Sequence, residues 1–187
     1  MLILGGSSAV GIFAIQLAKL AGLTVIATTS TGNVALVKSF GADRVIDYRT
    51  QDFTEAVQDV DLVLDAVGSE TQTRSFGVIR KDGLLLSLVS EPDEALARQY
   101  GVEIGNVHLN TTAARLGERA GLIDAGKLRF PIAREFFLDE AAAAHRLSEG
   151  GRTTGKIILR VTQLENVVLI ASFLTLPTTD ILDSLVL

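Results

Sequence analysis

Residues 2–22 read LILGGSSAVGIFAIQLAKLAG, an apolar run followed by a glycine- and serine-rich turn and a segment with helical spacing. A strand, a tight turn and a helix in this order begin a βαβ unit, the building block of parallel sheets. Gly22 is placed to end the helix in a left-handed conformation. Apolar residues at intervals of three and four predict one buried stripe of the helix, formed by Val10, Phe13, Ala14, Leu17, Ala18 and Ala21.

The same alternation of strand-length apolar runs and helical segments continues along the chain. Nearly continuous apolar strands indicate a sheet that is covered on both faces. Residues 81–83, Lys-Asp-Gly, are expected to form the turn before the most apolar strand. We therefore predict an α/β fold of the Rossmann type, a doubly wound, mostly parallel sheet with helices on both faces, over residues 1–161. The strands expected after the first lie within residues 24–28, 44–48, 62–67, 84–89, 102–109, 132–137 and 156–161.

Composition excludes several classes of function. The 187 residues contain no cysteine, which rules out disulfides, thiolate metal sites and a cysteine nucleophile. They contain only two histidines, so we expect no metal site, although composition leaves open a magnesium or calcium site made of carboxylates alone, for which no EF-hand spacing is present. The formal charge is −5 and basic residues are scattered, so we expect no nucleic-acid partner. With neither a signal peptide nor an apolar run of about 20 residues, we expect a cytoplasmic protein that does not enter membranes.

Residues 162–187 differ in character from the rest of the chain. Only Ser172 and Thr175 are polar between residues 167 and 176, and residues 181–187 are again mostly apolar. Such a segment is prone to aggregation when it is exposed. We expect this C-terminal tail to pack on its own domain, to swap onto a partner subunit, or to be disordered.

The turn from Gly5 to Gly11 lies where a doubly wound sheet binds a pyrophosphate. The N-terminus of the following helix offers unpaired backbone N–H groups and the positive end of the helix dipole to an anion. The turn reads GxxxxG instead of GxGxxG, so by itself it leaves two interpretations open. It either binds a nucleotide or serves only as a tight packing turn.

The end of the second strand bears on the choice of nucleotide. An NAD site usually carries an acid here for the ribose hydroxyls, about 20 residues after the glycines. The sequence instead has Thr28, Thr29, Ser30 and Thr31. An uncharged strand end tolerates a 2′-phosphate, which favours NADP(H) over NAD(H). The missing acid also disfavours an S-adenosylmethionine site, because that ligand too needs an acid for its ribose hydroxyls. The alternative is that the threonines are there only because they suit the end of a strand. Asp65, near the end of a buried strand, is interpreted as a hydrogen-bonded residue of the sheet edge.

Five segments in order, GGSSAVGIFAIQLAKLAG, LVKSFGADRVIDYR, DLVLDAVG, LIDAGKL and TGKIILRV, resemble the cofactor-binding domain of medium-chain dehydrogenase/reductases. The nearest branch is the zinc-independent quinone oxidoreductases, and the resemblance covers residues 1–161. It implies that the pyrophosphate lies on the turn and that Ser30 and Tyr48, with Arg49 nearby, contact the 2′-phosphate. A basic residue common in the family is replaced by Gly32 or Asn33. The implied cofactor-binding residues are Gly6, Ser7, Ser8, Ala9, Val10, Gly11, Ser30, Tyr48, Arg49, Val67, Gly68, Leu88, Val89 and Asn110.

The resemblance also implies hydride transfer from NADPH to a quinone, an enone or a carbonyl compound in a complete enzyme. Family members carry an N-terminal GroES-like β domain that holds the substrate pocket, and the 187 residues do not contain it. We therefore expect cofactor binding with weak or absent turnover. Family members also dimerise through sheet edges, so we expect a homodimer formed through a sheet edge or the C-terminal tail. The alternative is a non-catalytic Rossmann module that self-associates.

Overall fold

The computed structural model describes residues 1–107, 111–151 and 153–161. The chain forms two compact units, one of residues Met1–Arg129 and a second that begins at Phe130. In the first unit six strands, all paired in parallel, form a sheet in the order β3-β2-β1-β4-β5-β6. This order confirms the predicted Rossmann-type sheet. The strands are β1 (Leu2–Leu4), β2 (Ile26–Thr29), β3 (Arg44–Asp47), β4 (Val60–Asp65), β5 (Ile79–Ser87) and β6 (Glu103–Asn106).

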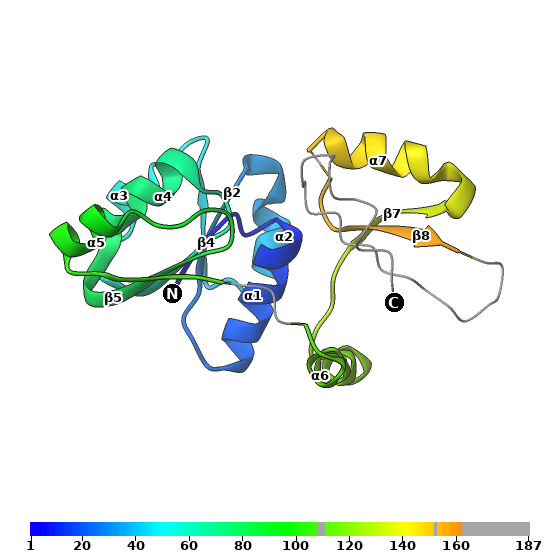
Figure 1. The fold of residues 1–187 in the computed structure, drawn as a ribbon, viewed down its shortest axis with the longest axis horizontal. Coiled ribbons are helices and arrows are strands. Elements are labelled where there is room, and N and C mark those ends of the chain that lie inside the picture. Colours follow the sequence, from blue (N-terminus) through cyan, green and yellow to red (C-terminus); the bar gives the residue numbers. More distant parts are fainter. Residues whose placement is uncertain (108–110, 152, 162–187) are drawn as a thin grey trace. The chain divides into compact units, whose positions relative to one another are not determined.

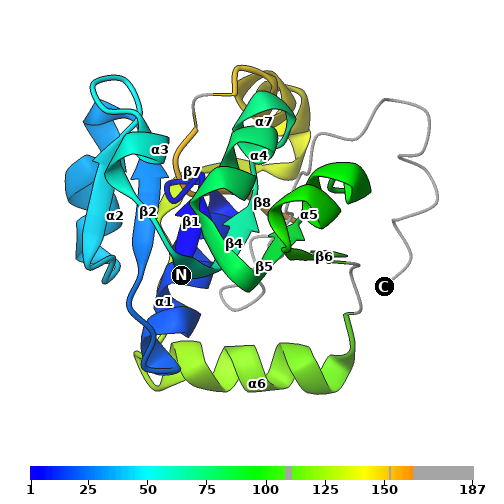
Figure 2. The same cartoon turned by 90° about the vertical axis from the view of Figure 1, so that its left-hand side faces the viewer.

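Helices cover both faces of this sheet, as the sequence predicts (Figure 1). Successive residues of β1 point to opposite faces: Ile3 joins a core cluster with α1 and α2, whereas Leu2 and Leu4 join a cluster with α3, α5 and the short turn after α4. Figure 2 shows α3, α4 and α5 in front of the sheet. The helices of the first unit are α1 (Ala9–Leu20), α2 (Val34–Ser39), α3 (Phe53–Ala56), α4 (Ser69–Ser75), α5 (Glu94–Tyr100) and α6 (Ala113–Asp124).

The face of α1 that is buried differs from the predicted stripe. Ile12, Ile15 and Gln16 are buried, whereas Val10 and Leu17 are 43% and 37% exposed and Ala21 is exposed as well, so the predicted stripe is wrong at these three positions. Almost every residue of α1 is apolar, so the spacing alone does not select a face. The buried Gln16 is satisfied by hydrogen bonds that no local pattern reveals. Gly22, with φ +78°, has the predicted left-handed conformation.

Residues 81–83 do not form the predicted turn. They lie inside β5, where the register with β4 shifts between Val60 and Leu62. Asp82 has a φ of +59°, and a Cβ on Gly83 would lie 2.6 Å from Cγ2 of Ile79. The Lys-Asp-Gly sequence thus forms an irregularity within a long strand. Such an irregularity favours the same residue types as a turn, which is why the sequence predicts a turn here.

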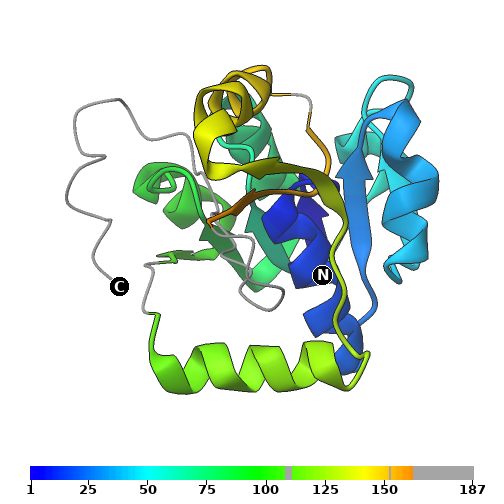
Figure 3. The ribbon, with the colours of Figure 1, turned by 90° about the vertical axis from the view of Figure 1, so that its right-hand side faces the viewer.

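The second unit contains a separate two-stranded parallel sheet of β7 (Ile132–Phe137) and β8 (Lys156–Arg160) with the helix α7 (Ala141–Glu149), as Figure 3 shows. Phe136, Ala144, Ile157 and Leu159 form its core cluster. The sequence prediction places residues 1–161 in one domain, whereas the contacts divide the chain after Arg129. Alternation of strands and helices does not reveal which sheet a strand joins. The C-terminal tail, residues 162–187, lies outside the described residues.

Among the described residues, no helix is long and apolar enough to cross a membrane.

Candidate functional site

The turn after β1 is tied to the end of β2 by backbone hydrogen bonds. Gly6 N–H donates to the Thr28 carbonyl over 2.8 Å, and Gly5 N–H donates to Oγ1 of Thr28 over 3.1 Å. Gly5 has a φ of +84°, a conformation that favours glycine. A Cβ on Gly6 would lie 2.8 Å from the Cβ of Ala27, so the turn presses directly on β2. The strand end and the turn therefore form one rigid edge.

The N-terminus of α1 is capped and leaves two backbone donors without a partner inside the helix. Oγ of Ser8 accepts a hydrogen bond from Gly11 N–H over 2.9 Å, which makes Ser8 the N-cap residue. Ala9 and Val10 occupy the first two helical positions, whose N–H groups have no acceptor within a helix. These two donors and the helix dipole favour an anion at this place.

The ends of β2 and β3 bring Ser30, Tyr48 and Arg49 to the same edge. Thr29 pairs in register with Asp47, so Ser30 and Tyr48 each follow the last residue of a neighbouring strand. Tyr48 is 58% exposed, and Arg49 is exposed as well. Both side chains are therefore open to a ligand, as a phosphate contact requires.

Asp47 is a charged residue at this edge that the sequence reasoning did not identify. Its Oδ1 accepts a hydrogen bond from Arg49 N–H over 3.0 Å. A hydrogen bond with the Thr31 side chain, aided by Arg49, holds the pKa of Asp47 below its ordinary value. The end of β2 contains no acid of its own, but β3 supplies one beside it. The signal was present in the sequence, because Asp47 directly precedes Tyr48.

The loops after β4 and β5 meet at a buried carboxylate. Oδ1 of Asp65 accepts hydrogen bonds from Val67 N–H and Gly68 N–H, each over 2.9 Å. The loop after β5 comes close, since a Cβ on Gly68 would lie 2.9 Å from Cγ2 of Val89. Asp65 is fully buried, which confirms its interpretation as a hydrogen-bonded residue of the sheet edge. Val67, Gly68, Leu88 and Val89 are thus brought together.

The resemblance implies a set of cofactor-binding residues. Those that the structure describes all follow the carboxyl ends of β1 to β5. The first six lie in the turn and the first helical positions after β1, and the others follow β2, β3, β4 and β5. Strands that run in parallel end at one edge, so the topology gathers these residues although they are up to 83 positions apart, from residue 6 to residue 89. Asn110 lies outside the described residues.

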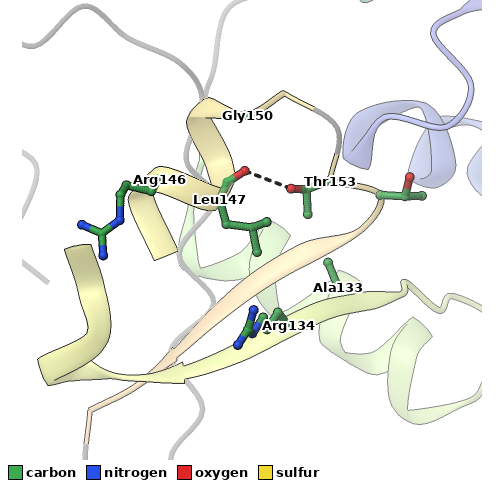
Figure 4. A pocket seen from close by; sticks show the side chains of 7 residues that line it. Ala133, Arg134, Arg146, Leu147, Gly150 and Thr153 are labelled. Atoms are coloured by element: carbon green, nitrogen blue, oxygen red, sulfur yellow. Dashed lines mark hydrogen bonds between the residues drawn. The ribbon is translucent and has the colours of Figure 1, made fainter. Parts of the chain in front are cut away.

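A surface hollow of the second unit contains none of these residues. Arg134, Arg146 and Thr153 are among the residues around it (Figure 4). The Thr153 hydroxyl donates to the Leu147 carbonyl over 3.2 Å, which closes the loop after α7. In the described residues no three histidine, aspartate or glutamate side chains are grouped to hold a metal ion.

Comparisons with known proteins identify relatives of this arrangement. A family model described as zinc-binding dehydrogenase matches residues 40–159. The chain is 33% identical to the mouse (Mus musculus) "NAD(P)H oxidoreductase RTN4IP1, mitochondrial", over 86% of this chain and 47% of that protein. It is 31% identical to a quinone oxidoreductase of Pseudomonas aeruginosa, over 80% of this chain and 53% of that protein.

Solved structures agree. The quinone oxidoreductase from Coxiella burnetii superposes with a TM-score of 0.80 at 34% identity, over 86% of this chain and 52% of that one. The Escherichia coli quinone oxidoreductase complexed with NADPH gives a TM-score of 0.75 at 27% identity, over 86% of this chain and 56% of that one. The chain spans about half the length of the relatives that it matches.

Proposed function

Because the chain belongs to the zinc-binding dehydrogenase family of the medium-chain dehydrogenase/reductases, we propose that its six-stranded unit binds a nicotinamide dinucleotide. The observation that carries the proposal is the convergence of five strand-end loops on one sheet edge, where the N–H groups of Ala9 and Val10 lack helical acceptors. The turn after β1 carries no acidic side chain that would repel a pyrophosphate.

Each part of the cofactor has residues suited to it. The turn from Gly6 to Gly11 would hold the pyrophosphate through its backbone N–H groups. The loops after β4 and β5, with Val67, Gly68, Leu88 and Val89, would flank the adenosine and the nicotinamide. When bound, the cofactor supplies a hydride. The residues of this chain bind it, orient it and shield one side of it from water.

We propose NADP(H) in preference to NAD(H). Ser30, Tyr48 and Arg49 offer hydroxyl and cationic donors at the strand ends where a 2′-phosphate would lie. One comparison supports this choice, because the Escherichia coli structure is complexed with NADPH. The name of the mouse relative refers to NAD(P)H and is compatible with either nucleotide. The carboxylate of Asp47 lies beside the same donors and limits the preference, because it repels a phosphate.

In the whole protein we propose hydride transfer from NADPH to a quinone, an enone or a carbonyl compound. The support is the similarity to a quinone oxidoreductase and to the 2-haloacrylate reductase of a Burkholderia species, which is 30% identical over 85% of this chain. The 187 residues alone are expected to bind the cofactor with little turnover. Turnover of a quinone by the pure chain at an ordinary enzymatic rate would contradict this expectation.

A titration of NADPH and NADH, followed by nucleotide fluorescence or calorimetry, tests cofactor binding. Tyr48→Ala removes a donor expected to reach the 2′-phosphate, so it should weaken NADPH binding about tenfold, from the loss of about 1.5 kcal/mol, and leave NADH binding nearly unchanged. Tyr100→Ala is the matched control, because Tyr100 lies on α5 and is also exposed. If neither nucleotide binds the wild-type chain, the proposal fails.

A non-catalytic, self-associating module is the alternative to be tested alongside. β3 and β6 are the two edge strands of the six-stranded sheet, and an open edge pairs readily with another strand. We propose a homodimer formed through one of these edges or through the C-terminal tail. Sedimentation velocity of the full chain and of a chain ending at Val161 tests it. A monomer in both cases would refute the dimer.

A further inference from the structure

We infer that Asp65 is a positioning residue. Its hydrogen bonds keep the loops after β4 and β5 together, and the affinity of the site for a nucleotide depends on these hydrogen bonds. The inference rests on the proposed function, because it concerns the same sheet edge. It assigns a role to a buried carboxylate that contributes neither a donor nor a charge at the surface of the site.

The Asp65 carboxylate accepts hydrogen bonds from three separate segments of the chain. Its Oδ1 binds the N–H groups of the next loop, those of Val67 and Gly68. Its Oδ2 accepts from Nε2 of Gln72 on α4 over 2.9 Å and from Oγ of Ser87 at the end of β5 over 3.2 Å. A buried charge is tolerated only with such a complete set of donors.

Ser87 links the Asp65 carboxylate to the loop after β5 by hydrogen bonds. Asp65 and Ser87 are paired in register as the last residues of β4 and β5. While the Ser87 hydroxyl donates to Asp65, its oxygen accepts from Val89 N–H and Ser90 N–H, each over 3.3 Å. The orientation of that hydroxyl is fixed by its donation to the carboxylate. One carboxylate therefore determines, directly or through Ser87, where four backbone N–H groups of two loops point.

Gln72 completes the link from the helix side. Besides Asp65, its Nε2 lies 2.9 Å from Oγ of Ser87 and 3.2 Å from Oγ of Ser90. Gln72 and Ser87 are both buried, so water does not replace these bonds when one is lost. Removing the carboxylate leaves several buried donors without an acceptor, and the loops are then free to separate.

Ser75 provides a matched control within the same region. It is fully buried, like Ser87, but its hydroxyl donates to the Gln72 carbonyl over 2.6 Å and contacts neither loop by a hydrogen bond. Ser75→Ala and Ser87→Ala each delete one buried hydroxyl group. A purely structural role predicts equal consequences for binding, whereas a positioning role predicts a difference.

The experiment compares wild type, Asp65→Asn, Ser87→Ala and Ser75→Ala as full chains, at a temperature where each is folded. We expect NADPH binding to weaken about tenfold in Asp65→Asn and Ser87→Ala and less than about twofold in Ser75→Ala. Hydrogen exchange without nucleotide gives an independent measurement. The N–H groups of Val67, Gly68, Val89 and Ser90 should exchange slowly in wild type and in Ser75→Ala. Those of Val89 and Ser90, which donate to Ser87, should exchange faster in both Ser87→Ala and Asp65→Asn, and those of Val67 and Gly68, which donate to Asp65, should exchange faster in Asp65→Asn.

The two measurements separate failure of this inference from failure of the proposed function. If wild type binds NADPH and Ser87→Ala binds it equally well, or if Ser75→Ala weakens binding as much as Ser87→Ala does, the inference is wrong. If the N–H groups of Val89 and Ser90 exchange equally fast in Ser87→Ala and in wild type, it is also wrong. If wild type binds no nucleotide although these groups are protected, the proposed function fails, and the dependence of affinity on Asp65 fails with it.

Discussion

A Cβ atom on Gly11 would lie 2.3 Å from the carbonyl oxygen of Gly5, a distance too short for any real Cβ atom. The contact joins the first turn of α1 to the turn that follows β1, and the atoms on the other side belong to backbone. Gly11 therefore sets the angle at which the helix leaves the sheet. The same contact keeps the N–H groups of Ala9 and Val10 at the carboxyl edge of β1.

Gly11→Ala is expected to lower the free energy of unfolding by about 2–3 kcal/mol, because neither partner is a flexible side chain that can move away. Urea denaturation measures the change. Gly117→Ala in α6 is the matched control, since a Cβ there would meet nothing within 4 Å. That variant should gain about 0.5–1 kcal/mol from the better helix propensity of alanine. An equal effect of the two substitutions would contradict the role of the Gly5 contact.

The buried side chain of Gln16 is expected to fasten the segment after α6 to α1. Its Oε1 accepts from Arg129 N–H over 2.9 Å and its Nε2 donates to the Arg129 carbonyl over 2.7 Å. Gln16→Leu leaves both backbone groups unpaired and should cost about 2–3 kcal/mol in the free energy of unfolding, measured in urea. Gln58→Leu, at an exposed position, should cost less than about 0.5 kcal/mol. If Gln58→Leu lowered the free energy of unfolding and Gln16→Leu did not, Gln16 would not have this role.

Asp47→Asn is expected to raise the preference for NADPH over NADH. The substitution keeps an acceptor for Arg49 N–H but removes the negative charge beside Ser30 and Tyr48. Removing the repulsion between this carboxylate and the 2′-phosphate should increase the ratio of the two affinities about fivefold at low ionic strength, and less at high salt. Calorimetric titration of each nucleotide measures the ratio. Asp59→Asn, one residue before β4 at the opposite edge of the sheet, should leave the ratio unchanged.

Asp43 is expected to make stability depend on acidic pH. Lys19 donates to both its oxygens, Val25 N–H donates to Oδ2 over 2.7 Å, and the Lys19 hydrogen bond is the largest cause that holds the pKa of Asp43 below its ordinary 3.8. A depressed pKa in the folded state stabilises the fold above the unfolded value. That contribution is lost as the pH falls through the folded value.

The stability difference between wild type and Asp43→Asn should therefore be present at neutral pH, begin to decrease as the pH falls below about 3.8, and vanish below the lower pKa that Asp43 has in the folded state. Urea denaturation at a series of pH values measures it. Lys19→Met removes the cation, so adding Asp43→Asn to it should change the pH dependence much less. A difference that stays constant down to the acid limit of folding would exclude this role of Asp43.

The local sequence predicts the fold and the cofactor edge because both depend on short patterns. The apolar run Leu2–Leu4 matches β1 exactly, and the turn before α1 lies where the glycines indicate. Once the strands alternate with helices, parallel pairing follows and brings strand ends to one edge. The residues themselves predict the turn, whereas the family resemblance implies Ser30, Tyr48 and the two later loops, and the structure places all of these at the carboxyl ends of the strands.

Partners across strands decided what the pattern left open. Asp47 contributes to the edge of β2 because of the register with Thr29, and Asp65 meets Ser87 because β4 and β5 end together. Likewise, Gln16 is buried because Arg129 returns to it from more than a hundred residues away. By itself the sequence determined the order of elements and the edge at which they end. Only the tertiary structure decided which charges and buried amides share that edge, because hydrogen bonds between distant segments leave no trace in local periodicity.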